Sequence, residues 1–279
     1  MTTGWIKETF KKPPAPRHLT NITTGIEHYL ESDQIAISQK FDGKRVMICR
    51  DTDSILAIGR SGSETDIPDS LSKTFMRVRP HWIFDGELVG DTYHAFDVIC
   101  LPERQNICSW TWKDRQELLD TVLSDFDDKV KVVRQVYGYK KTDFYEEAQR
   151  SNAEGVVFNN THGIYLPGKR NNTIAKFKFV KDVDCVVTDV SVNGKDNLEL
   201  SLYDDNNQLV PVGKVSALTG DGAKTDITVG DVVSVNFLYV TDSMKLYQPT
   251  KPKLRLDKQA TECKLWQLED YVTNKKVVV

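Results

Sequence analysis

The sequence predicts an α+β fold, in which antiparallel sheets with flanking helices are followed by an all-β domain. Short segments rich in β-branched and apolar residues recur along the chain and are bounded by Gly, Asn and Asp. Helical spacing of apolar residues occurs within residues 1–182, and after residue 182 strand-like segments follow one another. A chain of 279 residues has room for two domains, each with its own core. We therefore expect one domain over residues 1–182 and a second over 183–279.

The beginning of the chain predicts an arm and a helix. The first 17 residues are basic and contain three prolines, which predicts an extended arm. A helix is expected over residues 22–31, because apolar side chains recur there at intervals of three and four residues. These side chains are Ile26, Tyr29 and Leu30.

Short strands dominate the next part of the first domain. The β-prone segments are residues 34–39, 45–50, 54–59, 82–89 and 93–99. Asp-Gly pairs at 42–43 and 85–86 are typical of turns between such strands.

Two helices are expected to interrupt these strands. Residues 111–125 carry apolar side chains on one face, and Thr111 or Ser109 is suited to cap their amino end. A shorter helix is expected over 143–151. Strands return after it at residues 155–159 and 174–180.

The second domain has the pattern of a small closed barrel. Several β-branched strands, separated by Gly, Asn and Asp turns, occur there in fewer than a hundred residues. The segments are residues 184–192, 198–204, 209–218 and 230–241.

Composition excludes several classes of protein. Hydrophobic residues make up 39% and charged residues 28% of the chain, which is ordinary for a globular protein. No apolar run is long enough to cross a membrane, and the amino terminus lacks the apolar core of a secretory signal. The five cysteines are scattered without a C-x-x-C pair, which favours free thiols in a reducing cytosol over a disulfide framework or a zinc site.

The charge balance gives no general attraction to nucleic acid. The net charge is −3, so a polyanion site has to come from local clusters of basic residues. Any one such cluster is more often solvated surface than a binding site. The clusters are Lys7, Lys11, Lys12 and Arg17; Lys169 and Arg170; Lys176, Lys178 and Lys181; and Lys251, Lys253 and Arg255.

One short segment carries the strongest functional signal. In SQKFDGKRVMICR, residues 38–50, Lys40 stands two residues before Asp42-Gly43, and Arg45 follows. An Asp-Gly pair with charged neighbours is typical of a solvated hairpin turn. A lysine with cationic neighbours is also suited to nucleophilic chemistry, because nearby positive charge disfavours its ammonium form. The segment alone leaves both interpretations open.

Further charged and aromatic residues follow along the chain. They are Asp85-Gly86-Glu87, Phe96-Asp97, Glu154 before a strand, Lys176 and Lys178 at alternate positions of a strand, and Arg255, Asp257 and Lys258 in the second domain. Each has an ordinary structural alternative: a core phenylalanine, surface carboxylates, the solvated face of a strand or a solvated tail. Alternation puts the two lysines on one face of their strand.

Taken in this order, the motifs resemble those of the covalent nucleotidyltransferases, which are the ATP-dependent DNA ligases, the RNA ligases and the mRNA capping enzymes. The resemblance covers residues 34–258. VGKV at 212–215 and GDVVSVNFLYVT at 230–241 are most similar to the oligonucleotide-binding (OB) domain of small viral or bacterial ATP-dependent DNA ligases. The resemblance implies a nucleotidyltransferase (adenylation) domain over 1–182 and an OB-fold domain over 183–279.

The resemblance also implies ATP and Mg²⁺ (or Mn²⁺) as cofactors and gives the basic residues their roles. Lys40 is the nucleophile that attacks the α-phosphate, and Lys176 and Lys178 stabilise that phosphate and its transition state. Arg45 contacts the nucleotide sugar and the nick. Arg60, in IGRSGS, grips the 5′-phosphate of the nick, for which a planar guanidinium is well suited.

The remaining residues complete the implied nucleotide site. Phe96 offers a flat face on which adenine stacks. Glu87 holds the ribose hydroxyl, and the carboxylates of Glu154 and Glu87 are the implied metal ligands. The second domain contributes three residues, of which the last two face the pyrophosphate: Arg255, Asp257 and Lys258.

Together these residues predict an ATP-dependent DNA ligase that seals 3′-OH/5′-phosphate nicks in duplex DNA through a lysyl-AMP and a DNA-adenylate intermediate. Nicked duplex DNA is the expected partner, a monomer the expected state, and the cytoplasm (or the host cytoplasm or nucleoid for a viral protein) the expected location, with no membrane association. An mRNA capping guanylyltransferase and an RNA ligase are alternatives that share the lysine motif. A non-catalytic nucleic-acid-binding OB protein is a third alternative, against which the presence of every catalytic residue type argues.

Overall fold

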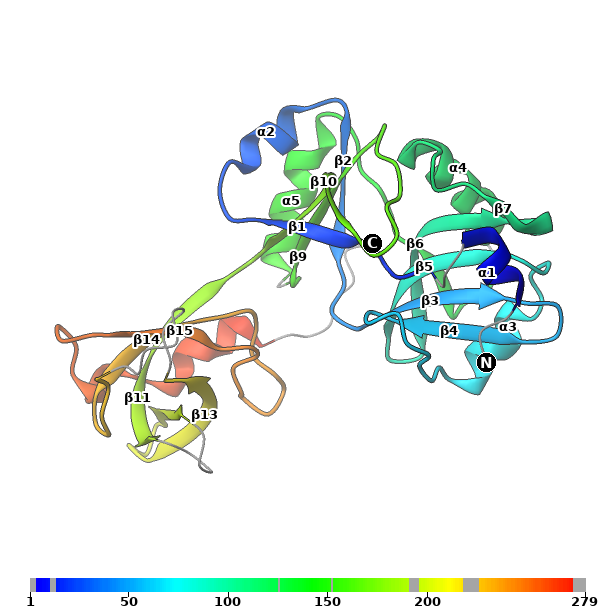
Figure 1. The fold of residues 1–279 in the computed structure, drawn as a ribbon. Coiled ribbons are helices and arrows are strands. Elements are labelled where there is room, and N and C mark those ends of the chain that lie inside the picture. Colours follow the sequence, from blue (N-terminus) through cyan, green and yellow to red (C-terminus); the bar gives the residue numbers. More distant parts are fainter. Residues whose placement is uncertain are drawn as a thin grey trace. The chain divides into compact units, whose positions relative to one another are not determined.

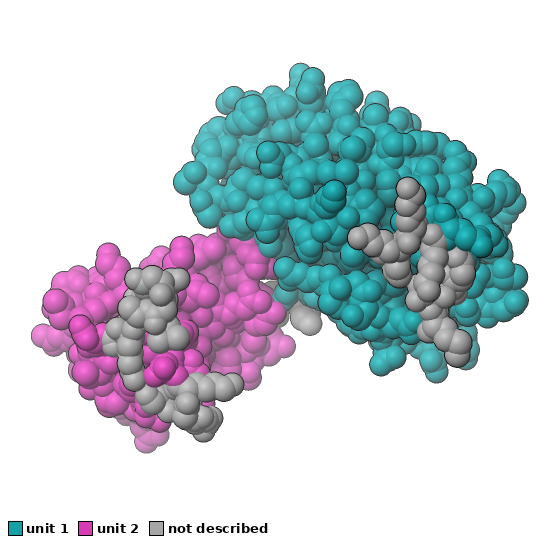
Figure 2. Space-filling model, viewed as in Figure 1, with its two compact units in different colours: residues 1–148, 155–177, 279 teal, residues 149–154, 178–278 magenta. Residues whose placement is uncertain are grey.

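The computed structural model describes residues 4–10, 14–124, 126–151, 153–190, 196–217 and 226–272. The chain divides into two compact units (Figure 2). Unit 1 comprises the described residues of 4–148 and 155–177, and unit 2 those of 149–154 and 178–272. Mixed sheets with few helices make up the fold, which agrees with the predicted α+β class (Figure 1). None of the helices in these ranges combines the length and apolarity that a membrane crossing needs.

The first sheet has four strands, in the order β1-β10-β9-β2. The strands are β1 (His18–Ile22), β10 (Arg170–Lys178), β9 (Gly155–Asn160) and β2 (Ile35–Lys40). β2 and β9 are antiparallel, whereas β1 and β10 are parallel.

The second sheet has the order β4-β3-β5-β6-β7, and β8 pairs with β6 off this path. Its strands are β3 (Lys44–Arg50), β4 (Ile55–Gly59), β5 (Ile83–Val89), β6 (Thr92–Leu101), β7 (Gln105–Asn106) and β8 (Val130–Val132). Neighbours along the path are antiparallel.

Helices pack around these sheets (Figure 1). They are α1 (Gly4–Phe10), α2 (Ile26–Glu31), α3 (Asp69–Phe75), α4 (Trp112–Leu123), α5 (Lys140–Arg150) and the 3₁₀ turn η1 (Pro102–Arg104). The predicted helix at 111–125 is confirmed, and its predicted cap is too, since the Thr111 side chain accepts a hydrogen bond from the backbone N–H of Asp114. α3 was not predicted.

The prediction of an extended amino-terminal arm is wrong. Residues 4–10 form α1, and residues 18–22 form β1. Trp5 and Ile6 are buried in one apolar cluster with Met47 and Ile83 of the second sheet. The lysines and prolines of this segment favoured an extended arm over a helix. The helix is short, and its apolar side chains Trp5 and Ile6 are explained only by their packing against the second sheet. α2 begins at Ile26 and not at Ile22, because Ile22 belongs to β1 and Gly25 has a left-handed backbone.

The two Asp-Gly pairs are not hairpin turns. Asp85 and Gly86 lie inside β5, and residues 41–43 connect β2 of the first sheet to β3 of the second. A Cβ added to Gly43 would lie 2.3 Å from the carbonyl oxygen of Leu88. Glycine is therefore required there for close approach between backbones, and not for a turn.

Unit 2 contains a five-stranded antiparallel sheet in the order β13-β12-β11-β14-β15. The strands are β11 (Lys181–Val190), β12 (Asn197–Tyr203), β13 (Leu209–Ser216), β14 (Val232–Phe237) and β15 (Thr250–Leu254). The edge strands β13 and β15 contact each other, so the sheet curls toward a barrel.

The segment after Lys258 packs on this sheet. It forms the 3₁₀ turns η3 (Ala260–Glu262) and η4 (Leu265–Tyr271). Cys263 and Leu268 are fully buried in the core of unit 2, and the Tyr271 ring lies edge-on to Phe237 with 5.5 Å between centroids. The segment, which had no predicted role, completes the core of this unit.

Burial of α1 leads to a stability prediction. Replacing Ile6 with alanine (I6A) leaves a cavity under the second sheet and should lower the free energy of unfolding by about 2–5 kcal/mol, measured by urea denaturation. The matched variant I164A removes the same atoms from a side chain that is 42% exposed, and it should cost less than about 1 kcal/mol. Equal losses for the two variants would contradict the burial of α1.

Candidate active site

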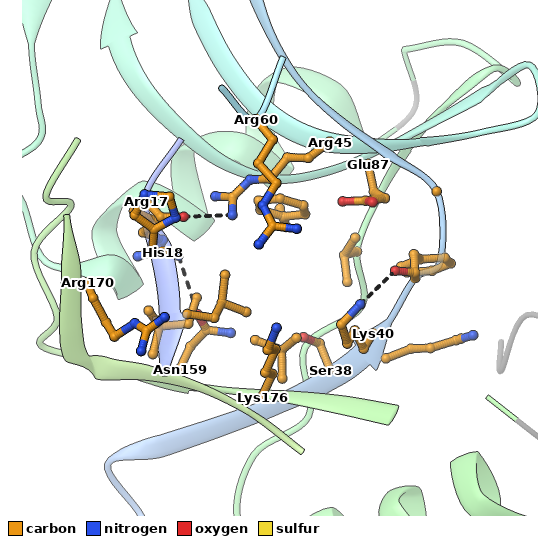
Figure 3. A pocket seen from close by; sticks show the side chains of 18 residues that line it. Arg17, His18, Ser38, Lys40, Arg45, Arg60, Glu87, Asn159, Arg170 and Lys176 are labelled. Atoms are coloured by element: carbon orange, nitrogen blue, oxygen red, sulfur yellow. Dashed lines mark hydrogen bonds between the residues drawn. The ribbon is translucent and has the colours of Figure 1, made fainter. Parts of the chain in front are cut away.

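A cavity of about 210 Å³ is lined by residues from both sheets of unit 1 (Figure 3). The first sheet contributes Ser38, Lys40, Asn159 and Lys176 among others, and the second contributes Arg45, Glu87 and Phe96. Arg60 reaches the cavity from the turn that follows β4. The labelled side chains of these residues surround one space in Figure 3.

Lys40 is the last residue of β2, at the point where the chain leaves the first sheet. Its Nζ lies 3.3 Å from the carbonyl oxygen of Phe41. The Phe41 ring stacks on His94 of β6, with 4.0 Å between centroids and 20° between planes. The stack fixes the connection between the sheets, and with it the position of Lys40.

Arg45 is held by a buried carboxylate of the neighbouring strand. Its Nε and Nη2 donate to the two oxygens of Asp85 at 3.1 and 2.7 Å, and the Asp85 side chain is fully buried. Burial alone would lower the pKa of Arg45, but Asp85 outweighs it and raises that pKa. The guanidinium carbon lies 5.1 Å from the centre of the Phe96 ring, so the arginine covers the aromatic face.

Asp85 is also part of a larger buried network. The Tyr165 hydroxyl donates to Asp85 at 2.5 Å and accepts the backbone N–H of Arg17 at 3.1 Å. Arg45 in turn donates to the Arg17 carbonyl at 2.7 Å. These hydrogen bonds connect the segment before β1 to Arg45, which lines the cavity.

The other end of the network is Asp97, the second aspartate of the predicted motifs. Arg17 pairs with Asp97 at 2.9 Å, and Arg115 of α4 pairs with the same carboxylate at 2.7 Å. Burial lowers the pKa of Arg17, and the charge of Asp97 opposes this effect. Asp97 therefore orders the structure and does not face the cavity.

Basic groups dominate the wall of the cavity. Besides Lys40, Arg45 and Lys176, its lining includes Arg17, His18, Arg60 and Arg170, and Glu87 is the carboxylate among the lining residues. An open groove adjoins the cavity and shares Arg45 and Arg60 with it; Lys44, Ser61 and Ser63 also line this groove. Such a surface is suited to phosphate groups.

Two of the predicted residues pair with each other instead of lining the cavity. Lys178 at the end of β10 forms an ion pair of 2.9 Å with Glu154, which precedes β9. Glu154 is nearly buried, and both residues belong to unit 2.

The three predicted residues of the second domain form a cluster within unit 2. Arg255 contacts both Asp184 and Asp257, and Lys258 contacts Asp184. The hydrogen bond from Arg255 lowers the pKa of Asp257 to about 2.

Six of the predicted residues therefore line one cavity: Lys40, Arg45, Arg60, Glu87, Phe96 and Lys176. Arg17, His18, Asn159 and Arg170 line it too but were not predicted as site residues. Arg17 and Arg170 belong to the basic clusters seen in the sequence, which was the available signal. Nothing in the sequence pointed to Asn159, or to Asp184 in unit 2.

The carboxylate that lines the cavity is suited to bind a divalent cation together with the phosphate groups of a substrate. Within the described residues, no group of three or more His, Cys, Asp or Glu side chains could hold a metal by itself. Mg²⁺ is usually bound by one or two carboxylates together with substrate phosphates and water. Glu87 is the cavity carboxylate that meets this requirement.

Comparisons with known proteins point to one family. Residues 91–178 match the family model for the ATP dependent DNA ligase domain. DNA ligase of Nanoarchaeum equitans is 26% identical over 180 residues, which cover 58% of this chain and 30% of the relative. DNA ligase of Thermococcus fumicolans is 24% identical over 250 residues, which cover 74% of this chain and 45% of the relative. The chain thus spans less than half the length of these relatives.

Solved structures show the same fold. A Lig E DNA ligase aligns with a TM-score of 0.63 at 16% identity, covering 86% of this chain and 99% of that one. A mycobacterial DNA ligase D complexed with ATP and MES aligns with a TM-score of 0.52 at 19% identity, covering 90% and 97%.

The described residues share the fold of these two DNA ligases, and the mixed sheets with few helices confirm the predicted α+β class. The match of residues 91–178 and the two relatives confirm the predicted resemblance of the chain to the ATP-dependent DNA ligases.

The close approach at Gly43 leads to a second prediction. The methyl group added in G43A would collide with the Leu88 carbonyl, so the free energy of unfolding should fall by about 1–3 kcal/mol in urea denaturation. A methyl group in the control G59A would lie at ordinary contact distance, 3.6 Å from its nearest neighbour, and should change stability little. A stable G43A would show that β2 and β3 are not joined as described.

The buried His94 leads to a pH prediction. Burial, with a smaller effect of Lys131, lowers the pKa of His94 to about 4 from 6.5. Between these values the unfolded chain binds the proton that the folded chain excludes, so the free energy of unfolding should fall as the pH drops from 6.5 to 4. The fall should be smaller in H94Q and unchanged in the control H28Q, whose histidine is exposed. Urea denaturation at several pH values measures it, and identical profiles for all three proteins would contradict the burial of His94.

Proposed function

We propose that the chain is an ATP-dependent DNA ligase that seals 3′-OH/5′-phosphate nicks in duplex DNA. The observation that carries the proposal is the cavity of unit 1, in which Lys40, Glu87, Phe96 and Lys176 line one space. The match of residues 91–178 to a DNA ligase domain supports the choice of reaction.

In the first step, the lone pair of the Lys40 Nζ attacks the α-phosphorus of ATP. A P–N bond forms, the bond between the α-phosphorus and the bridging oxygen breaks, and pyrophosphate leaves with its electron pair. The amine gives up its protons to solvent. The product, lysyl-AMP, keeps the nucleotide activated for transfer.

The cavity is suited to hold the nucleotide for this step. The Phe96 ring, covered on one side by Arg45, offers a platform for the base, and Glu87 accepts a hydrogen bond from the ribose. Lys176 stabilises the negative charge that develops on the α-phosphate oxygens. Lys178 joins Lys176 in this role once its ion pair with Glu154 is exchanged for phosphate.

A Mg²⁺ or Mn²⁺ ion bound by the phosphates would neutralise the leaving pyrophosphate. Glu87 is the cavity residue that would hold it, with Glu154 as the second carboxylate of the proposal.

In the second step, a 5′-phosphate oxygen of the nick attacks lysyl-AMP, the P–N bond breaks, and AMP passes to the DNA. In the third step, the 3′-hydroxyl attacks the 5′-phosphorus, a phosphodiester bond forms and AMP leaves. Arg60, which is exposed and lines both the cavity and the open groove, grips the 5′-phosphate.

Residues 1–182 act as the adenylation domain in this proposal, and residues 183–279 as the OB domain. Asp257 and Lys258 of the OB domain face the pyrophosphate in the first step, with Arg255 beside them as a nucleotide-binding residue, and the domain then turns to grip duplex DNA. We further propose that the enzyme acts as a monomer in the cytoplasm, or in the host cell if it is viral.

Labelling of Lys40 tests the function. Incubation with α-labelled ATP and Mg²⁺ should attach the label covalently to the protein, and chasing with nicked duplex DNA should release AMP and seal the nick. K40A should lose at least about 1,000-fold in labelling, since the nucleophile is removed. K73A removes an exposed lysine of α3 and should be labelled like the unchanged protein.

Other outcomes of this experiment decide against the proposal. Label that survives in K40A would exclude Lys40 as the nucleophile. Labelling by GTP and not by ATP would indicate a capping guanylyltransferase, and sealing of nicked RNA alone would indicate an RNA ligase. DNA binding with no labelling by either nucleotide would indicate a non-catalytic nucleic-acid-binding protein.

A further inference from the structure

Asp184 of β11 lies at the centre of the charged cluster in unit 2. Both of its oxygens accept hydrogen bonds from Nη1 of Arg255, at 2.9 and 3.1 Å, and one of them lies 2.7 Å from Nζ of Lys258. Arg255 uses its Nε and Nη2 on Asp257, at 2.9 and 2.8 Å. The four side chains carry two positive and two negative charges, so the cluster neutralises itself.

The strand pattern explains how an aspartate comes to be buried here. Val183 and Cys185 belong to the core of unit 2, so alternation puts Asp184 on the opposite face of β11. It is nevertheless only 8% exposed, because Arg255 and Lys258 cover it. β14 lies between β11 and β15, and β15 ends immediately before Arg255, so the sheet itself brings the two cations to Asp184.

The two cations of the cluster are less exposed than the carboxylate of Asp257 beside them. The side chains of Arg255 and Lys258 are 28% and 30% exposed and contact Asp184, whereas the carboxylate of Asp257 is 68% exposed. A pyrophosphate group that approaches this cluster meets the carboxylate most readily, and the cations are already occupied. Contact with Asp184 also raises the pKa of Lys258.

We propose that the Asp184 carboxylate occupies the phosphate position on Arg255 and Lys258, so that the pyrophosphate part of ATP must compete with it for these two cations. The inference rests on the proposed function and deepens it, by making Asp184 a positioning residue of the nucleotidyl-transfer step. Asp184 holds the two cations together and offsets part of their charge when no nucleotide is bound, and it weakens binding of the pyrophosphate group.

The reversal of step one measures this competition directly. Adding inorganic pyrophosphate and Mg²⁺ to the labelled lysyl-AMP protein lets a pyrophosphate oxygen attack the α-phosphorus. The P–N bond breaks, ATP forms and the Lys40 amine takes up protons. The pyrophosphate concentration that gives half the maximal rate reports how strongly the protein binds pyrophosphate.

In D184N the side chain keeps its size but loses its charge, so this half-saturating concentration should fall about three- to tenfold. D184E keeps the charge and should stay close to the unchanged protein. The control E199Q removes the same charge from the Glu199–Lys214 pair of the same sheet, at 3.7 Å, and should have no effect. An unchanged or raised value in D184N, or an equal fall in E199Q, would overturn the proposal.

Lysyl-AMP labelling and thermal unfolding distinguish a failure of the proposed function from a failure of the role of Asp184. If the unchanged protein forms no lysyl-AMP at all, the proposed function fails, whereas normal labelling with an unaltered response in D184N overturns only the role of Asp184. Thermal unfolding establishes that each variant is folded. If D184N is unfolded, D184S takes its place in the same titration with the same expected fall and the same contradicting result.

Discussion

The structure of the cavity depends on one buried carboxylate, that of Asp85. It holds Arg45 through two hydrogen bonds and accepts a third from Tyr165, which in turn fixes the backbone of Arg17. Removing one partner from a buried pair leaves an uncompensated charge and costs about 3–5 kcal/mol, so these groups can hardly move separately. Arg45 is thereby kept over Phe96, and the segment before β1 is fixed against the second sheet.

The connection from β2 to β3 brings residues of the first sheet to the same cavity as Arg45. Because residues 41–43 pass from one sheet to the other, Lys40 ends the first sheet while Arg45 belongs to the second, and the two side chains line one cavity. The cations of this cavity line a space of about 210 Å³. In unit 2, Arg255 and Lys258 are paired with the carboxylates of Asp184 and Asp257. The two units thus differ: unit 1 has a cavity lined mainly by basic residues, and unit 2 has a compact cluster of two cations and two carboxylates.

Much of this could be read from the sequence. Motif order identified six cavity residues, because Lys40, Glu87 and Lys176 belong to short patterns that are local in the chain. The sequence did not reveal α1, since the apolar face of Trp5 and Ile6 is hidden among lysines and prolines. Asp85 and Asp97 were recognised as motif residues, but their partners Arg17 and Arg115 come from distant segments that only the fold brings together. Asp184 also gave no signal in the sequence. Its partners Arg255 and Lys258 follow β15, which only the fold places two strands from β11.

The central claim is that one cavity holds the nucleotide with its α-phosphate against Lys40. A crystal structure with an ATP analogue whose α–β bridging oxygen is replaced by a methylene group tests it most directly, because the analogue cannot transfer its nucleotide. We expect the base on Phe96, the ribose beside Glu87 and the α-phosphate within contact of the Lys40 and Lys176 amines. An analogue bound elsewhere, or bound in this cavity with its α-phosphate turned away from Lys40, would contradict the account.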